Sequence, residues 1–596
     1  MKQFFKFMFA TIAGMIVMGL ISIVILIGII SSLSSTEEST KVKDNSVLHL
    51  TLSDPIPDRT PENPFHNFSF SNMEPDFSIG LDRFLKTIEH AKTDDKIKGI
   101  YLDISSIPTG MANLEEVRAS LLDFKTSGKW IISYSEIYSQ KGYYLASVAD
   151  QVYLNPAGIM ELRGLSSELM FFKNALEKLD VEVQIIRHGK FKSAVEPFML
   201  EKMSEPNRKQ MELILNSTWI SMLDAVTTSR KISFETINEL ADKIKIQDAK
   251  DALEHGFVDK LVYKDELLDI LKEKLALKDE KDENEINLLK LNKYAASLVN
   301  PFEELKKLSP TNNQIAVIYA SGNIVSGKGE KDDMGSETIS SAIREARLDT
   351  NVKAIVLRVN SPGGSALASD VMWREVVLAK KAKPVVVSMG NVAASGGYYI
   401  SCAADKIVAD EKTITGSIGV FGVIPNAKGF FNNKLGITFD TVKTNTHSDM
   451  MTIFRPLTAE EKGIIQIGVE KIYDDFITKV ADGRKMTKEQ VDSIGQGRVW
   501  VGTDALKIGL IDEIGGMNRA IEIAKDMAKL DTYELVDYPK VKKNPFMDVV
   551  IALSEDAETR IVKNKLGESF KYYQKIEKVS TQSGIMARMP YEIEIH

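Results

Sequence analysis

The sequence predicts an α/β protein made of two copies of one parallel-sheet domain. Two observations lead to this fold class. Residues 88–106 (IEHAKTDDKIKGIYLDISS) align without a gap with residues 343–361 (IREARLDTNVKAIVLRVNS), and the match resumes between 142–150 and 397–405. In both copies, short β-branched runs alternate with charged, helix-forming stretches. This alternation is typical of parallel strands joined by crossover helices.

The N-terminal segment, residues 1–35, is expected to be a membrane anchor. Residues 7–30 carry no charge and, at about 1.5 Å per residue, are long enough to span a hydrocarbon core of about 30 Å. A cleaved signal peptide is the alternative, but its apolar region would be about 7–15 residues long. Lys2 and Lys6 precede the apolar stretch, so we expect the short end in the cytoplasm, residues 7–30 in lipid, and both domains on the far side.

The repeat sets the expected domain boundaries. We assign the first copy to 45–262 and the second to 312–540. The segment between them, 263–311, is rich in Lys, Glu and Leu, and we expect a helix and a linker with a solvated, charged face. Residues 541–596 have no partner in the repeat, but the alternation in their last part, MARMPYEIEIH, is compatible with an added strand or arm.

Composition argues against several classes of function. A net charge of -8 disfavours a nucleic-acid partner, because binding to phosphates requires a basic surface. The single cysteine, Cys402, excludes a disulfide within the chain, and its apolar surroundings indicate a core residue. The seven histidines show no metal-binding spacing, so we expect neither a metal ion nor another cofactor.

The differences between the copies indicate where a functional site lies. Ser395 of the second copy is opposite Gln140 of the first, and the loop NSPGGS (360–365) is opposite SSIPTG (105–110). A serine before a helix, or a glycine-containing turn, is by itself more often structural. Because both features occur together in one copy and are both missing from the other, we interpret Ser395 as a nucleophile and the loop as part of its site.

Glycines near Ser395 can supply the donors of an oxyanion hole. Gly363 and Gly364 follow a β-branched run, and without a Cβ their N–H groups can approach a ligand closely. Gly396 follows Ser395 at the start of a predicted helix, where its N–H points outward. Fixed N–H donors of this kind stabilise a developing oxyanion by about 3–4 kcal/mol each.

The base for this serine is expected from the first copy. In the alignment Lys192 is opposite Ser448 and Lys190 is opposite Thr446, so only the first copy carries amines at these positions. A lysine can act as a base if its pKa falls from about 10.4 towards 7, and burial in an apolar pocket can cause such a fall. We therefore predict a divided site, with Ser395 from the second copy and Lys192 from the first.

Histidines offer an alternative base. His447 lies in the polar stretch KTNTHSDM, with Asp449 close by in sequence but not clearly placed to orient the ring. His188 is close to Lys192 in sequence and would at most support the lysine.

The motifs NSPGGS, AASGGYY, TGSIGVFG and KFKSAVEPF resemble those of the signal peptide peptidase A family of membrane-anchored serine peptidases, in its long, duplicated form. The resemblance implies a dyad of Ser395 and Lys192, with oxyanion donors at Gly396 and at Gly363, or alternatively Gly364. It also implies that the hydroxyl of Ser417 holds the lysine amine. The fold implied is a ClpP- or crotonase-like α/β spiral.

The same resemblance implies a homo-oligomer, for which we expect a tetramer, with active sites facing inward. Its substrates would be cleaved signal peptides and other apolar peptides at the bacterial inner membrane, and the catalytic domains would lie on the periplasmic side. Two other functions stay open. One is a catalytically inactive, membrane-anchored scaffold that binds peptides, and the other is a crotonase-like enzyme acting on an acyl-CoA, which the predicted anchor disfavours.

Overall fold

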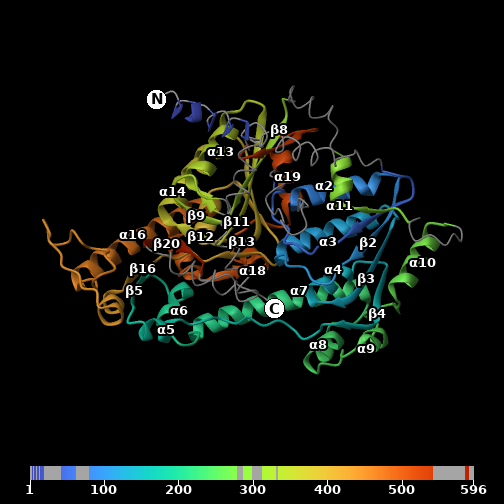
Figure 1. Ribbon diagram of the computed structural model, residues 1–596, viewed down its shortest axis with the longest axis horizontal. Coiled ribbons are helices and arrows are strands. Elements are labelled where there is room, and N and C mark those ends of the chain that lie inside the picture. The colour runs from blue at the N-terminus through green and yellow to red at the C-terminus, as the bar shows by residue number, and fades with distance from the viewer. Residues whose placement is uncertain are drawn as a thin grey trace.

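Two mainly parallel sheets form the frame of the protein. The computed structural model describes residues 42–61, 79–277, 286–298, 312–330, 333–540 and 584–589, with scattered residues between 3 and 18. The first repeat, blue to green in Figure 1, lies beside the second, which is yellow to orange. Helices cover the sheets, as expected for strands joined by crossover connections. The predicted α/β class with two copies of a parallel-sheet domain is confirmed.

The first sheet consists of six parallel strands. These are β1 (Ser46–Leu50), β2 (Ile97–Asp103), β3 (Trp130–Tyr138), β4 (Gln151–Met160), β6 (Lys260–Leu261) and β7 (Leu288–Lys290), in the spatial order β6-β4-β3-β2-β1-β7. Helices α2 (Leu81–Thr93), α3 (Met111–Lys125), α4 (Gln140–Ala146), α8 (Phe234–Asp242) and α9 (Ala249–Glu254) connect and flank them. The central strand β2 buries five of its seven residues, as expected for a parallel strand that is covered on both faces.

The second sheet repeats this plan. Its strands are β8 (Gln314–Ser321), β11 (Val352–Ser361), β13 (Val385–Ala394), β14 (Lys406–Ala409), β15 (Ile414–Gly416), β17 (Val499–Val501), β18 (Glu513–Ile514) and β19 (Glu534–Tyr538), with only β17 antiparallel to its neighbour. The order β13-β11-β8-β19 matches β3-β2-β1-β7 of the first sheet. Its helices are α13 (Ser336–Leu348), α14 (Ala366–Lys380), α15 (Gly396–Ser401), α16 (Ala459–Arg484), α17 (Lys488–Ile494), α18 (Gly502–Lys507) and α19 (Met517–Met527).

A third, smaller sheet joins the repeats. It has the order β10-β9-β12-β20-β16-β5 and contains β5 (Glu182–Arg187), β9 (Asn323–Val325), β10 (Asp333–Gly335), β12 (Gly363–Ser365), β16 (Phe421–Asn426) and β20 (Gly584–Arg588). The first-repeat strand β5 pairs antiparallel with the second-repeat strand β16 along six residue pairs. After β5 the chain continues through the 3-10 turn Ser193–Val195, α6 (Glu196–Met199) and α7 (Glu205–Arg230). This crossing brings the residues after β5 next to the second repeat.

The segment predicted as a helical linker belongs partly to the first domain. It contains α10 (Lys264–Lys274) and α11 (Leu291–Ser297), as expected, but β7 lies between them and pairs with β1 at the edge of the first sheet. Leu267 and Leu271 of α10 are fully buried, so this helix has an apolar face as well as its charged one. Residues 278–285 and 299–311 of the predicted linker lie outside the described residues.

A buried ion cluster also ties the repeats together. Arg358 of β11 is fully buried, and its guanidinium lies 2.8 Å from a carboxylate oxygen of Asp58 and 2.8 Å from one of Glu116, both in the first repeat. Asn113 accepts a further hydrogen bond from Arg358 at 2.9 Å. The first repeat thus supplies both counter-charges for a cation of the second.

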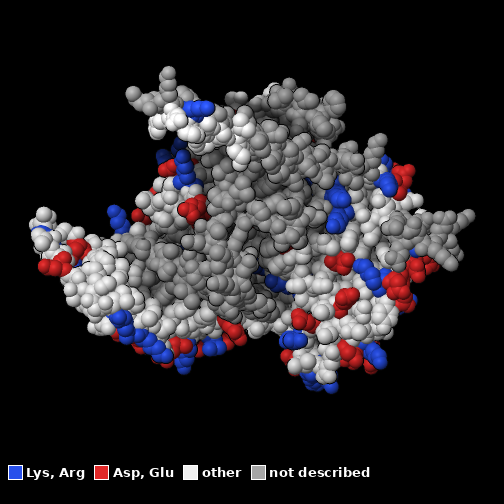
Figure 2. Space-filling view, viewed as in Figure 1, with Lys and Arg blue, Asp and Glu red and all other residues white. Residues whose placement is uncertain are grey.

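The structure bears on the predicted membrane anchor and on the predicted lack of a nucleic-acid partner. Of the predicted anchor, residues 19–30 and several before them lie outside the described residues. Within the part of the chain that is described, no helix combines the length and the apolarity that crossing a membrane requires. On the face shown in Figure 2, basic and acidic side chains are interspersed and form no continuous basic stripe among the residues drawn in colour.

Candidate active site

Ser395 sits in a sharp turn between strand β13 and helix α15. Its backbone has φ 54° and ψ -112°, a conformation that is strained for any residue other than glycine, by about 1–3 kcal/mol. The N–H of Ser395 donates to the Gly416 carbonyl oxygen at 2.8 Å and holds the turn. The residues that follow have to be small, because a Cβ on Gly396 would lie 2.6 Å from Ser369 Oγ and one on Gly397 would lie 2.8 Å from the Ser361 carbonyl oxygen.

Lys192 reaches Ser395 from the other repeat. It lies between β5 and the 3-10 turn at Ser193, and its Nζ is 2.9 Å from Ser395 Oγ. Both side chains are fully buried. The same Nζ lies 3.0 Å from Ser417 Oγ and 3.1 Å from the Ser417 carbonyl oxygen. The structure therefore brings together the three side chains that the sequence singled out.

The environment of Lys192 favours its neutral form. Burial lowers its pKa well below the ordinary value of 10.5. The Phe421 ring forms one wall, with its centroid 5.9 Å from Nζ. Among the described residues no carboxylate lies within ion-pair distance of this amine. A neutral amine has two N–H groups, which the two Ser417 oxygens can accept, and this leaves its lone pair for the Ser395 hydroxyl.

Gly497 holds the lysine backbone, and the sequence comparison missed it. It lies before β17 with φ 84°, and a Cβ there would lie 2.6 Å from the N, Cα and Cβ atoms of Lys192. Gly419 plays a similar part further along the side chain, where a Cβ would lie 3.2 Å from Lys192 Cδ. The only sequence signal for Gly497 is a second glycine in the motif IGQGRVW, and nothing there connects it to a residue three hundred positions earlier.

The glycine loop lies beside the serine turn. Gly363 has φ 94°, and a Cβ on it would lie 2.6 Å from the Gly396 nitrogen, so the two predicted oxyanion positions face the same space. The N–H of Gly363 donates to Ser361 Oγ at 3.1 Å in this structure. Gly364, the alternative donor, lies one residue further along β12, opposite Ala587 of β20.

The first repeat has a closed counterpart of this site. Gln140 begins α4 where Ser395 precedes α15, and its Oε1 accepts hydrogen bonds from the N–H groups of Arg163 at 2.8 Å and Gly164 at 2.9 Å. Its Nε2 donates to the Gly164 carbonyl oxygen at 2.8 Å. The glutamine side chain thus satisfies the local backbone itself, and the first repeat carries no nucleophile at this position.

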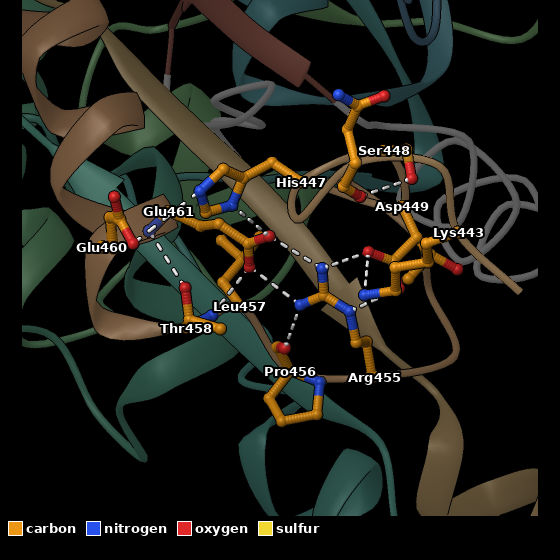
Figure 3. Close-up of polar contacts among 12 residues, drawn as sticks. Lys443, His447, Ser448, Asp449, Arg455, Pro456, Leu457, Thr458, Glu460 and Glu461 are labelled. Carbon is orange, nitrogen blue, oxygen red and sulfur yellow. Dashed lines mark hydrogen bonds and ion pairs between the residues drawn. The ribbon is translucent and has the colours of Figure 1, made fainter. Parts of the chain in front are cut away.

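The alternative base His447 is engaged elsewhere. Figure 3 shows it in a cluster at the start of α16, where Nδ1 lies 3.3 Å from Glu461 Oε1 and Nε2 lies 3.7 Å from Glu460 Oε2. Asp449 pairs with Arg455 at 2.7 Å rather than with the histidine ring. Ion pairing with Arg455 lowers the pKa of both Asp449 and Glu461. This cluster pins a surface loop to the helix.

The other residues considered in the sequence analysis, His188, Lys190 and Cys402, lie outside the candidate site. His188 lies 2.6 Å from Glu470 and stacks on Tyr473, while Lys190 is exposed. Cys402 is fully buried in the core of the second repeat, and burial raises the pKa of its thiol to about 12, which agrees with the predicted core role. Within the described part of the chain, no group of three or more His, Cys, Asp and Glu side chains is arranged to hold a metal ion.

Comparison with known proteins agrees with this arrangement of two related halves. The profile of peptidase family S49 matches residues 123–278 and 378–531, one segment in each repeat. Protease 4 of Haemophilus influenzae is 36% identical over 517 residues, covering 85% of this chain and 83% of that protein. Protease 4 of Salmonella typhi is 39% identical over 464 residues, covering 76% and 73%. The chloroplastic serine protease SPPA of Arabidopsis thaliana is 34% identical over 501 residues, covering 82% and 70%. This chain belongs to peptidase family S49.

Proposed function

We propose that this protein is a serine endopeptidase in which Ser395 is the nucleophile and Lys192 is the general base. The observation that carries the proposal is the 2.9 Å separation of Lys192 Nζ and Ser395 Oγ, two fully buried groups, at a place where burial lowers the pKa of the amine. A buried lysine without a carboxylate partner is costly to a protein, and a catalytic base is a function that requires one.

The reaction is an acyl transfer. Lys192 takes the proton of the Ser395 hydroxyl as the oxygen attacks the peptide carbonyl carbon, and it then protonates the leaving amine. Water cleaves the resulting ester with the same lysine as base. The N–H of Gly396, with that of Gly363 or Gly364, stabilises the oxyanion, and Ser417 keeps the amine directed at Ser395.

Location and substrates form the second part of the proposal. Residues 7–30 anchor the chain in the bacterial inner membrane, with both repeats on the periplasmic side, and the enzyme degrades cleaved signal peptides and other apolar peptides there. The uncharged stretch 7–30 and the motifs shared with the signal peptide peptidase A family support this. A ClpP- or crotonase-like spiral and assembly into a homo-oligomer, taken as a tetramer, belong to the same proposal.

A serine-directed probe tests the catalytic assignment. A fluorophosphonate is expected to label Ser395, and Ser395→Ala is expected to abolish both labelling and hydrolysis of an apolar reporter peptide while leaving the unfolding transition in place. A peptide-binding scaffold without catalysis would bind the reporter peptide but show neither labelling nor hydrolysis. Continued hydrolysis by Ser395→Ala would remove the serine from the mechanism.

A further inference from the structure

The glycine loop of the second repeat, residues 360–365, is tied to the first repeat by one amide side chain. Asn360 is the first residue of this loop and lies near the end of β11. Its Nδ2 donates to Asp58 Oδ2 at 2.6 Å, and its Oδ1 accepts the N–H of Val392 at 3.2 Å. Asp58 belongs to the first repeat, whereas Val392 belongs to β13, three residues before Ser395. The side chain of Asn360 therefore links the first repeat to the strand that carries the serine turn.

Asn360 lies at an irregular place in the second sheet, where β11 runs beside β13 (Figure 1). The register between these strands shifts between Val359 and Ser361, which leaves residues 390–392 of β13 opposite Asn360. In this stretch the side-chain oxygen of Asn360 accepts a backbone N–H of β13. A Cβ on Gly390 would lie 3.0 Å from Asn360 Cγ, so the strand packs directly against this side chain. Because an amide has one acceptor end and one donor end, the contact with β13 directs its Nδ2 at the first repeat.

Hydrogen bonds connect the start of the glycine loop to the predicted oxyanion donors. The carbonyl oxygen of Asn360 accepts the N–H of Gly322 at 3.0 Å, and Ser361 Oγ donates to the Gly322 carbonyl oxygen at 2.6 Å. Ser361 Oγ in turn accepts the N–H of Gly363 at 3.1 Å. Gly363 has φ 94°, and a glycine has no side chain that would fix such a conformation by itself. The position of the loop therefore depends on the contacts of the residues that precede its glycines.

Asp58 is a rigid, buried support for Asn360. Its side chain is 4% exposed, and its carbonyl oxygen accepts the N–H of Asp82 at the start of α2 at 3.3 Å. One carboxylate oxygen accepts the bond from Asn360, while the other accepts a bond from Arg358 Nε at 2.8 Å. A neutral amide at position 58 has only one oxygen, so it could serve only one of these two donors.

The first repeat lacks the corresponding link. Ser105 aligns with Asn360, and its hydroxyl lies 2.9 Å from Ser135 Oγ, within the same repeat. A contact that served only to pack neighbouring strands would be expected in both copies. The amide instead occurs in the copy that carries Ser395 and the glycine loop.

We infer that Asp58 is a positioning residue for the reaction, which acts through Asn360 to hold the glycine loop where its N–H groups stabilise the oxyanion. The inference rests on the proposed function, because the loop matters for catalysis only if Ser395 is the nucleophile. Asp58 does not touch the reacting atoms. With this role, the first repeat supports both parts of the chemistry, since it supplies Lys192 as the base and Asp58 as the support of the oxyanion hole.

The test compares two buried carboxylates that pair with the same arginine. Glu116 Oε1 lies 2.8 Å from Arg358 Nη1, but the other oxygen of Glu116 accepts the N–H of Met517 rather than a bond from Asn360. Asp58→Asn is expected to lower kcat for a reporter peptide at least about tenfold without a rise in KM, because removal of one oxyanion donor costs about 100–1,000-fold and a displaced donor loses part of that. Glu116→Gln should keep the wild-type kcat at a temperature where both variants are folded.

The pH profile separates this role from an effect on the base. The pH at which kcat/KM rises should be the same in Asp58→Asn as in the wild type, because the surroundings of Lys192 are unchanged. A shifted profile, a rise in KM with unchanged kcat, or wild-type kinetics in Asp58→Asn would overturn the inference.

Exchange of the two partners provides a rescue. In Asn360→Asp two carboxylates face each other, so kcat should again fall. In the double variant Asp58→Asn/Asn360→Asp, the amide at position 58 can accept from Arg358 and donate to the carboxylate at position 360, whose other oxygen accepts the N–H of Val392. The double variant should therefore fold and recover most of the lost kcat.

Two outcomes distinguish failure of the inference from failure of the proposed function. If the double variant stays as slow as the single variants, or if Glu116→Gln loses as much kcat as Asp58→Asn, the role of Asp58 is refuted and the peptidase assignment stands. If the wild type neither hydrolyses the reporter peptide nor reacts with a fluorophosphonate at Ser395, the proposed function fails and the inference fails with it.

Discussion

Gly497 offers a test of the idea that catalysis depends on where the backbone of Lys192 is held. In Gly497→Ala the new Cβ would lie 2.6 Å from three atoms of Lys192, whereas carbon atoms pack at about 3.5–4.0 Å. The two backbone segments must therefore separate by about 1 Å, and a misplacement of that size can reduce an enzymatic rate about 100-fold. We expect kcat/KM for a reporter peptide to fall by about that factor, which corresponds to about 2.7 kcal/mol.

The matched control for this variant is Gly256→Ala. Gly256 has φ 77°, close to the 84° of Gly497, but a Cβ there has no atom within 4 Å. In both variants a residue with a Cβ must adopt a left-handed conformation, which costs about 1–2 kcal/mol of stability. Both variants should therefore have a lower denaturation midpoint than the wild type. Only Gly497→Ala should lose activity at a temperature where both are folded. Wild-type kcat/KM in Gly497→Ala, or an equal loss in Gly256→Ala, would refute the argument that the glycine positions the base.

Three further predictions follow from the site and the interface between repeats. Lys192→Ala should reduce hydrolysis by at least about 100-fold, as expected for loss of a general base, while Lys190→Ala, at an exposed position, should keep the wild-type rate; the reverse result would move the base to Lys190. In the wild type, kcat/KM should rise with pH through a pKa well below 10.5, because only neutral Lys192 can accept a proton and burial disfavours the charged form; a rise only near pH 10 would contradict the buried base. Arg358→Met should lower the free energy of unfolding by about 3–5 kcal/mol in denaturant titration, because it leaves Asp58 and Glu116 buried without their cation; an unchanged midpoint would show that the ion cluster contributes no net stability.

The serine and the lysine could be proposed from one sequence because the chain contains its own comparison. Ser395 differs from Gln140, and Lys192 differs from Ser448, at aligned positions of the two copies. The apolar periodicity of the strands is local, so the two parallel sheets followed from it as well. Each of these signals is contained within one element or within one pair of aligned segments.

The parts that sequence reasoning missed depend on contacts between distant segments. β7 lies in a stretch dominated by charged residues, and its strand identity comes from pairing with β1, far earlier in the chain. Gly497 matters because of a backbone that approaches it from the other repeat. The tail strand β20 showed alternation, but its place between β12 and β16 could not be deduced from its own residues. All three features depend on contacts between segments far apart in the sequence, and such contacts leave no local sequence pattern.

Neither repeat can form the candidate dyad alone. The first has the buried lysine but closes the serine position with Gln140, whose side chain bonds to the backbone of Arg163 and Gly164. The second has Ser395, but its position equivalent to Lys192 is Ser448, in the loop that the Arg455 cluster pins to α16.

The pocket that lowers the pKa of Lys192 is likewise built from the second repeat, by Ser417, Gly419, Phe421 and Gly497. Lys192 is therefore desolvated beside Ser395 only when β5 has paired with β16, the strand that also pairs with β20. Formation of the candidate dyad and desolvation of Lys192 thus depend on the same contact between repeats, so a change that loosens the β5–β16 pairing should impair both together.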